Sequence, residues 1–238
     1  MIRAELIPPN EPARIAAVHR YDILDTPTDG TFDRITRLAS TLLDMPVAIV
    51  SIVDTDRIWF KSHHGLDAQQ IDRDPGLCAS AILGTGAWVI EDAEFDPRTL
   101  ANPLVASENG VRFYAGVPLT TQDGFNLGTM CVLDTKPREF PEDRVSLLQD
   151  LAAIVMDEME LRLAARTALA TIEERARQAT EMNDDVVQSL AVAKLALDLG
   201  NAEEAGQSIS SALVASRRIL DELAQDLPTL RRTAAVRI

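Results

Sequence analysis

The sequence predicts a protein of the α+β class that continues into a long helix and a helical hairpin. All ten aromatic residues lie between Tyr21 and Phe140, so the last 98 residues contain none. Residues 142–199 form a 58-residue stretch without glycine or proline. Short β-branched segments alternate with helical periodicity only before that stretch. We therefore expect two domains, residues 1–160 and 161–238.

Composition and charge exclude several classes of protein. The chain is 46% hydrophobic, which is enough for a substantial core, and its net charge of −14 opposes binding to nucleic acid or to anionic membranes. It has no run of 18 apolar residues and no apolar signal core near its start, so we expect a cytoplasmic protein. Its two cysteines are too few for a disulfide framework or a cysteine-only metal site, and no metal is expected.

Two helices are expected at the start of the first domain. Asn10 is a typical N-cap, Pro12 suits the first turn, and apolar positions follow at helical spacing. The segment Thr26-Pro27-Thr28-Asp29-Gly30 interrupts the chain. Apolar residues at helical spacing then predict a second helix over residues 32–43, which ends before the next proline.

The period then changes to that of strands. Residues 47–53 are rich in β-branched side chains and end at Asp-Thr-Asp, which predicts a buried strand with a hairpin partner at 58–62. A short helix is expected over residues 77–83. Further strands are expected at residues 88–90, 111–119 and 126–134. Hairpins interleaved with helices favour an antiparallel sheet.

Several segments of the first domain resemble a bacterial GAF sensor domain. They are residues 23–27 (ILDTP), 51–54 (SIVD) with 59–61 (WFK), 113–119 (FYAGVPL) and 127–134 (LGTMCVLD). The resemblance implies a PAS-like antiparallel sheet with helices on one face and a pocket on the other. It leaves the cofactor unknown, because GAF domains bind cyclic nucleotides, haem, bilins or small metabolites. The Asn-Lys-Phe-Asp-Glu signature of the cyclic-nucleotide-binding members is absent from the sequence.

Aromatic side chains are common in small-molecule sites, so Trp59, Phe60, Phe113 and Tyr114 are candidate pocket residues. Each of them alone fits a core between sheet and helices equally well. Cys78 is a further pocket candidate and a candidate redox-active thiol, since a position near a helix start lowers the pKa of a cysteine.

Other polar residues of the first domain favour structural roles. His63 and His64 are adjacent and point to opposite sides of an extended chain, so we assign them to a solvated loop rather than to a metal or haem. No histidine follows Cys78, as would be expected for bilin attachment in phytochromes. Cys131 lies inside a predicted strand and is assigned to the core.

The second domain consists of strong helix formers. Leu161, Ala165, Ala168, Ile172, Arg175, Ala179, Met182 and Val186 follow alternating spacings of four and three, which is a heptad seam. Gly200-Asn201 ends this helix, and residues 202–225 form a second one. Pairing of two such hairpins predicts a dimeric four-helix bundle.

Residues 181–190 (EMNDDVVQSL) with 193–197 (AKLAL) resemble the phosphoacceptor helices of histidine kinases that partner LuxR-type response regulators. That family carries His-Asp-x-x-x-Gln. Asp184 and Gln188 match its acid and its amide, but Asn183 stands at the histidine position, and an amide cannot pass on a phosphoryl group. Autokinase activity is therefore not expected, and no ATP-binding domain is identified.

The sequence thus predicts a non-catalytic signalling sensor, a homodimer that detects a small ligand or redox state through its GAF domain and acts on a response regulator or histidine kinase. An alternative is a response-regulator phosphatase that uses Asp184 and Gln188. A third possibility is a redox enzyme that works through Cys78. Asp184 and Gln188 are equally well explained as part of the polar face of an amphipathic helix.

Overall fold

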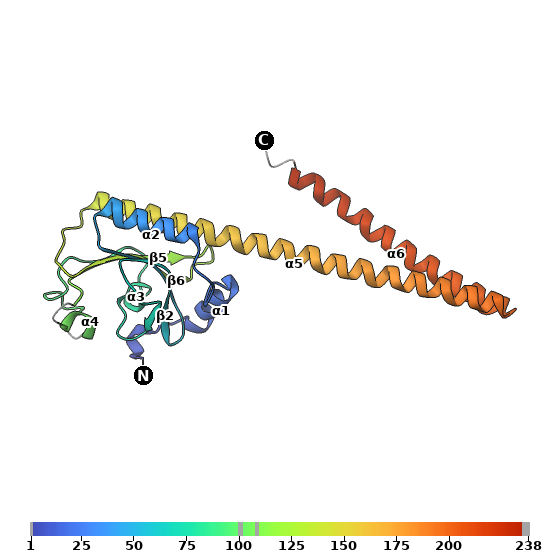
Figure 1. Cartoon of the computed structure of the whole chain (residues 1–238), viewed down its shortest axis with the longest axis horizontal. Helices are drawn as coiled ribbons and strands as arrows, with labels where there is room; N and C mark the ends of the chain where they lie inside the picture. Colours follow the sequence, from blue (N-terminus) through green and yellow to red (C-terminus); the bar gives the residue numbers. More distant parts are fainter. Residues whose placement is uncertain (1, 100–101, 108–109, 235–238) are drawn as a thin grey trace. The chain divides into compact units, whose positions relative to one another are not determined.

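The computed structural model describes residues 2–99, 102–107 and 110–234, with the side chains of the last helix as far as Ile219. The chain divides by its internal contacts into a first unit, Met1–Ala164, and a second unit, Ala165–Ile238. Sheet and helices make up the first unit, and two helices make up the second (Figure 1). The observed secondary structure confirms the α+β class.

A six-stranded sheet forms the centre of the first unit, with the order β3-β2-β1-β6-β5-β4 and antiparallel pairing throughout. The strands are β1 (Val47–Val53), β2 (Arg57–His64), β3 (Gln70–Asp72), β4 (Trp88–Ile90), β5 (Phe113–Thr120) and β6 (Asn126–Asp134). The sequence did not predict β3, because a strand of three residues is too short to show alternation. The predicted partner at 58–62 is longer than expected and includes both histidines.

The helices of the first unit are η1 (Ala4–Leu6), α1 (Glu11–Tyr21), α2 (Gly30–Leu43), α3 (Leu77–Ala81), α4 (Pro103–Ala106) and the start of α5 (Glu142–Asp198). Side chains cap the free amides at the start of two of them, α2 and α4. Asp29 accepts a hydrogen bond from the Thr31 amide at 2.9 Å, which starts α2 two residues before the predicted position. Asn102 caps α4 in the same way at 2.9 Å, whereas Asn10 makes no side-chain capping bond.

The two faces of the sheet carry separate cores. One face packs against α1, α2 and the first part of α5, through residues such as Val18, Phe32 and Leu148. The other face is covered by α3 and by the chain around α4, with residues such as Ile58, Leu77 and Val105 between them. Successive residues of a strand point to opposite faces, so each buried strand contributes to both cores.

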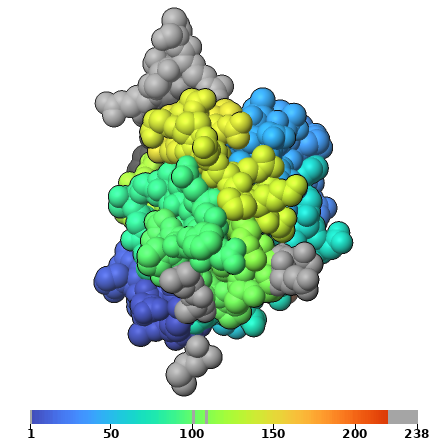
Figure 2. Space-filling view, turned by 90° about the vertical axis from the view of Figure 1, so that its left-hand side faces the viewer, coloured from blue at the N-terminus to red at the C-terminus, as the bar shows by residue number. Residues whose placement is uncertain are grey.

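Helices α2 and α5 lie side by side in antiparallel directions. Arg162 of α5 forms a salt bridge of 2.5 Å with Asp29 at the start of α2, and Arg144 donates to the Leu43 carbonyl at its end, at 3.2 Å. Figure 2 shows the same neighbours from the end of the unit, with α2 in light blue beside the yellow start of α5. Tyr21 adds a link from α1, since its hydroxyl donates to Glu160 at 2.5 Å.

The second unit contains the rest of α5 and α6 (Ala202–Ala234). Gly200 between them has a φ of 78°, a conformation that favours glycine. Asn201 accepts a hydrogen bond from the Glu204 amide at 3.2 Å and so caps α6. The second helix is longer than expected, because Pro228 removes one backbone hydrogen bond without ending it.

Candidate functional site

The five predicted pocket residues do not line one pocket. Trp59 and Phe113 belong to the core under α1, α2 and α5, whereas Phe60, Cys78 and Tyr114 belong to the core under α3. Trp59 and Phe60 are neighbours on β2, and Phe113 and Tyr114 are neighbours on β5, so each pair divides between the two faces. The candidates thus divide between two cores, and Phe60, Cys78 and Tyr114 stay together in one of them.

That second group contains both cysteines of the chain. Cys78 is in α3 and Cys131 is in β6, and their Sγ atoms lie 3.8 Å apart. Both thiols are reduced and buried. The assignment of Cys131 to the core is correct in position, but its contact with Cys78 depends on how α3 packs on the sheet. No pattern within either segment predicts that contact.

Three hydroxyl groups surround the two thiols. The Ser51 and Thr129 hydroxyls bond to each other at 2.9 Å across the β1–β6 pair, on the face that also carries Cys131. The Tyr114 hydroxyl is fully buried and has no hydrogen-bond partner among the described residues. Such a group is rare, because a buried polar atom without a partner costs about 1–3 kcal/mol.

Glycine makes room for this tyrosine. Gly116 lies directly opposite Cys131 in the β5–β6 pair, and a Cβ at Gly116 would lie 2.3 Å from the Tyr114 hydroxyl oxygen. The ring of Tyr114 meets Trp88 edge to face, with centroids 5.3 Å apart. These contacts hold the hydroxyl at the thiol pair.

The cluster separates the acidities of the two thiols. The nearby Cys131 thiol, followed more weakly by the hydroxyl groups of Ser51, Thr129 and Tyr114, lowers the pKa of Cys78 against the opposing effect of burial. The interaction with Cys78 and burial raise the pKa of Cys131 well above its ordinary value. Burial likewise raises the pKa of Tyr114. Cys78 is therefore the thiol that ionises more readily, and the tyrosine keeps its proton and can act as a hydrogen-bond donor.

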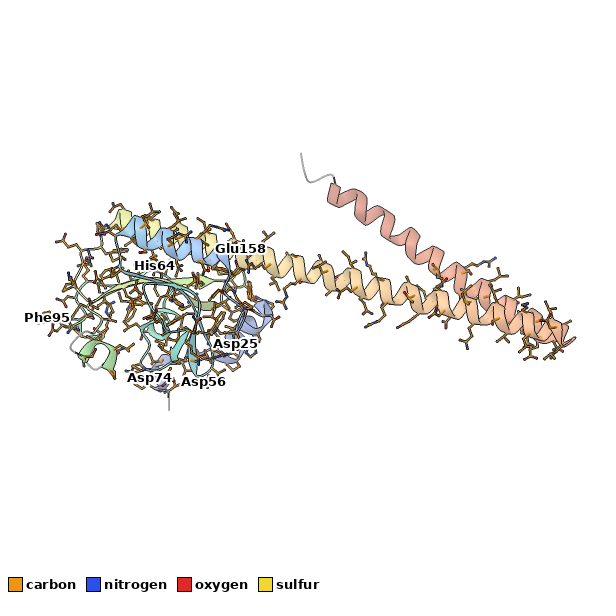
Figure 3. All side chains as sticks on the ribbon, viewed as in Figure 1. Asp25, Asp56, His64, Asp74, Phe95 and Glu158 are labelled. Atoms are coloured by element: carbon orange, nitrogen blue, oxygen red, sulfur yellow. The ribbon has the colours of Figure 1, made fainter. Side chains whose placement is uncertain are left out.

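The other candidates of the first unit lie away from this cluster. His63 and His64 end strand β2 instead of lying in a loop, and His64 is exposed (Figure 3). Within the described part of the chain, no three His, Cys, Asp or Glu side chains gather in a way that could hold a metal ion. None of the described helices is both long and apolar enough to span a membrane.

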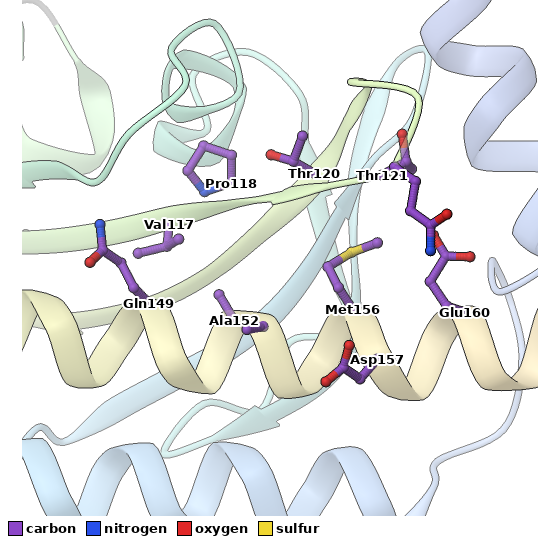
Figure 4. Close-up of a pocket in the computed structure, with 11 residues that line it drawn as sticks. Val117, Pro118, Thr120, Thr121, Gln149, Ala152, Met156, Asp157 and Glu160 are labelled. Atoms are coloured by element: carbon purple, nitrogen blue, oxygen red, sulfur yellow. The ribbon is translucent and has the colours of Figure 1, made fainter. Parts of the chain in front are cut away.

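A surface groove of about 360 Å³ lies between β5 and α5 (Figure 4). Val117, Ala152 and Met156 line its floor, and the carboxylates of Asp157 and Glu160 lie at one end. Glu160 already accepts a hydrogen bond from the Tyr21 hydroxyl. The thiol cluster is the better candidate site.

In the second unit, the three predicted residues of α5 are all exposed. Gln188 lines a groove of about 630 Å³ between α5 and α6, together with Asp185 and Arg218. Asn183 and Asp184 lie outside that lining. In the structure Gln188 therefore shares a groove with Asp185, whereas the kinase motif pairs it with Asp184.

Comparison with known proteins decides the family of the first unit. The GAF domain family matches residues 27–159, which is more than half of the chain. The chain belongs to the GAF family. The resemblance noted in the sequence is thereby confirmed, and the six-stranded sheet with its helices is the GAF domain.

One GAF relative is a cyclic di-GMP phosphodiesterase of Pseudomonas aeruginosa. The two are 41% identical over 150 residues, which is 63% of this chain and 26% of that protein. The chain therefore spans about a quarter of that relative's length.

Two solved structures are similar to this chain at low identity. The blue-light absorbing form of the Thermosynechococcus elongatus PixJ GAF domain is 16% identical, with 66% of this chain and 94% of that chain covered and a TM-score of 0.48. Free methionine-R-sulfoxide reductase from Neisseria meningitidis is 20% identical, with 63% and 89% covered and a TM-score of 0.48. Neither similarity carries an argument about activity.

Proposed function

We propose that the chain is a non-catalytic signalling sensor, a homodimer whose GAF domain receives a small-ligand or redox signal and whose helical hairpin acts on a response regulator or histidine kinase. The observation that carries this proposal is a set of large apolar side chains left outside the hairpin. They are Val187, Leu190, Leu195, Leu197, Ile209, Leu213 and Val214, each between 40% and 68% exposed.

The buried side chains of the hairpin are small by comparison. Among the described residues of the second unit, those buried are Ala193, Ala196, Ala205, Ala212 and Ala215. Alanines let two helices approach closely but bury little apolar area, and a helical pair of this kind is marginal alone. A second copy that covers the exposed leucines completes a dimeric four-helix bundle.

The mass of the protein in solution tests this proposal. Native mass spectrometry of the wild-type chain should give a dimer, and the double variant Leu190→Glu/Leu197→Glu should give a monomer, because it places charges in the apolar seam. Ala191→Glu adds the same charge at an exposed position without a large apolar side chain and should stay dimeric. A monomeric wild-type protein would contradict the proposal.

The GAF domain supports the sensory half of the proposal. Its 41% identity to a segment of a cyclic di-GMP phosphodiesterase indicates a domain type that also occurs in a protein of second-messenger turnover. Helix α5 begins in the GAF core and runs to the hairpin as one helix, Glu142–Asp198. A change in the GAF core can therefore reach the hairpin without crossing a loop.

The phosphatase alternative rests on Gln188. Its exposed amide lines a groove that also holds Asp185, Arg218 and serine hydroxyls, which suit a phosphorylated carboxylate. Phosphorylated response regulators incubated with the protein should lose phosphate faster than they do spontaneously, and Gln188→Ala should remove that acceleration. Gln178→Ala, at an exposed site on the same helix, is the matched control. No acceleration by the wild-type chain would exclude this activity.

A further inference from the structure

We propose that Cys78 and Cys131 form a peroxide-reactive dithiol site, in which oxidation joins the two side chains in an intramolecular disulfide. The sequence assigned Cys131 to packing alone, and the structure brings its sulfur into contact with that of Cys78, at 3.8 Å. A disulfide needs a sulfur–sulfur distance of about 2.05 Å, so the two atoms must approach by about 1.8 Å.

The polar groups at the site fit this chemistry better than they fit a structural role. The Tyr114 hydroxyl is fully buried and has no hydrogen-bond partner among the described residues. It lies close enough to Cys78 to influence the ionisation of that thiol. A thiolate, or the oxygen of a sulfenic acid, is the acceptor that this hydroxyl lacks.

Ser51 and Thr129 complete the set of donors. Their hydroxyls bond to each other at 2.9 Å, and the Ser51 hydroxyl also lies 3.3 Å from the Thr129 carbonyl oxygen. When Ser51 donates to the Thr129 hydroxyl, the hydrogen of Thr129 is left to turn towards sulfur. A buried thiolate without donors is costly, and these three hydroxyls offset that cost. The side chains thus stabilise the charged form that attacks a peroxide.

The reaction balances without a cofactor. The Cys78 thiolate attacks one oxygen of hydrogen peroxide, the O–O bond breaks, and the leaving hydroxide takes a proton to become water. The resulting sulfenic acid is attacked by the sulfur of Cys131, which loses its proton, and a second water leaves. In sum, two thiols and one peroxide give a disulfide and two water molecules. The sulfurs lose two electrons, and the peroxide gains them.

The disulfide would bond α3 to the centre of the sheet. Cys78 belongs to a helix of only five residues, whereas Cys131 is held on both sides by β1 and β5. We therefore expect α3, rather than β6, to move when the disulfide forms. This inference names the signal of the proposed sensor, and it rests on the proposed function only for the effect downstream. Loss of the dimer would leave the thiol chemistry intact, and loss of the thiol chemistry would leave the dimer.

The test uses the reduced full chain and hydrogen peroxide. Intact-mass spectrometry should show the loss of two hydrogen atoms, a peptide map should join Cys78 to Cys131, and dithiothreitol should reverse the change. Cys131→Ser should instead accumulate a sulfenic acid at Cys78, which dimedone traps. Cys78→Ser should leave Cys131 unmodified under the same conditions.

Tyr114→Phe isolates the role of the hydroxyl as a positioning group, because it keeps the ring and removes one oxygen. The pH at which the Cys78 thiolate forms, followed by its ultraviolet absorbance, should rise. Disulfide formation measured below that pH should slow, by less than about tenfold for each unit of the rise, because a thiolate of higher pKa is intrinsically more nucleophilic. A merely structural hydroxyl would leave this pH profile unchanged.

Three results would overturn the proposal. They are thiols that react only in the denatured chain, a disulfide that joins two chains, and oxidation of Cys78 beyond sulfenic acid while Cys131 stays free. The wild-type measurements need no variant, so misfolding of a substituted chain cannot hide these outcomes.

Discussion

Tyr114 and Gly116 show at the scale of single residues how a missing side chain shapes the thiol cluster. Position 116 faces Cys131 across the β5–β6 pair, and the tyrosine hydroxyl occupies the space that a side chain would take. The close approach is to the end of a ring held between strands and Trp88, so it cannot move away freely.

Gly116→Ala is therefore expected to destabilise the fold by about 1–3 kcal/mol through overpacking. Gly86→Ala is the matched control, because a Cβ at Gly86 meets nothing within 4 Å, and it should change stability by less than about 0.5 kcal/mol. Urea denaturation of both variants measures the difference. Equal stability of the two variants would show that the tyrosine yields at no cost.

Glu11 is the second residue that the tertiary structure makes important. It pairs with the buried guanidinium groups of Arg14, at 2.7 Å, and Arg73, at 2.5 Å. Burial raises the pKa of Glu11, but the hydrogen bonds and charges of the two arginines outweigh burial and hold it below 4.5. The stability from this carboxylate is present above that pH and is lost as the pH falls through the lowered pKa.

Glu11→Gln should cost about 3 kcal/mol at pH 7, since it leaves two buried charges without their partner. The difference from wild type should shrink as the pH falls through the lowered pKa of Glu11, because protonation removes the same charge. Glu5→Gln, at an exposed pair with Arg3, should cost less than about 1 kcal/mol. Unfolding curves across pH measure both, and a difference that grows in acid would refute the assignment.

At the scale of elements, the contact between α2 and α5 links the sheet to the long helix. Asp29 both caps α2 and pairs with Arg162, whose guanidinium lies 4.8 Å from the centre of the Phe32 ring. The hydrogen bond from Arg162 lowers the pKa of Asp29 to about 2, so this carboxylate is charged at neutral pH. One side chain thereby starts one helix and positions the other.

Two substitutions separate these roles. Asp29→Asn keeps a capping oxygen and loses the ion pair, whereas Asp29→Ala loses both. The alanine variant should therefore be less stable than the asparagine variant by about 1 kcal/mol. Thermal unfolding at pH 7 measures the two, and equal losses would mean that the cap contributes nothing.

At the scale of the whole molecule, the two units use different kinds of side chain. The GAF domain holds all the aromatic residues and is closed by Leu148, Leu151, Val155 and Met159 of α5. These residues precede the end of the first unit at Ala164. The hairpin buries alanines and exposes leucines, which suits pairing between copies.

A chain that ends at Ala164 should therefore keep the GAF fold and become monomeric. Circular dichroism should show the mixed sheet and helix content, and native mass spectrometry should show single chains. A truncated protein that remains dimeric would locate the interface in the GAF domain instead.

Sequence patterns were sufficient to predict those strands and helices whose formation depends on residues close together in the chain. The strands at 47–53 and 126–134 follow from their β-branched content, and the long helix follows from the absence of breakers. The same alternation would have separated Trp59 from Phe60, and Phe113 from Tyr114, had it been applied to the pocket candidates. The short elements β3 and α4 escaped prediction because they span no full period, whereas β4, a strand as short as β3, was recognised from its Trp-Val-Ile content.

By itself the sequence determined the class of the fold, its GAF character and the contrast between an aromatic domain and an alanine-rich helical one. These follow from composition and from repeats of two and 3.6 residues, which neighbouring residues carry. Only the tertiary structure decided that Cys78 and Cys131 meet, that Tyr114 lacks a partner, and that Glu11 holds two buried arginines. Each of these contacts joins segments that are far apart in the chain, and their positions depend on how whole elements pack on the sheet.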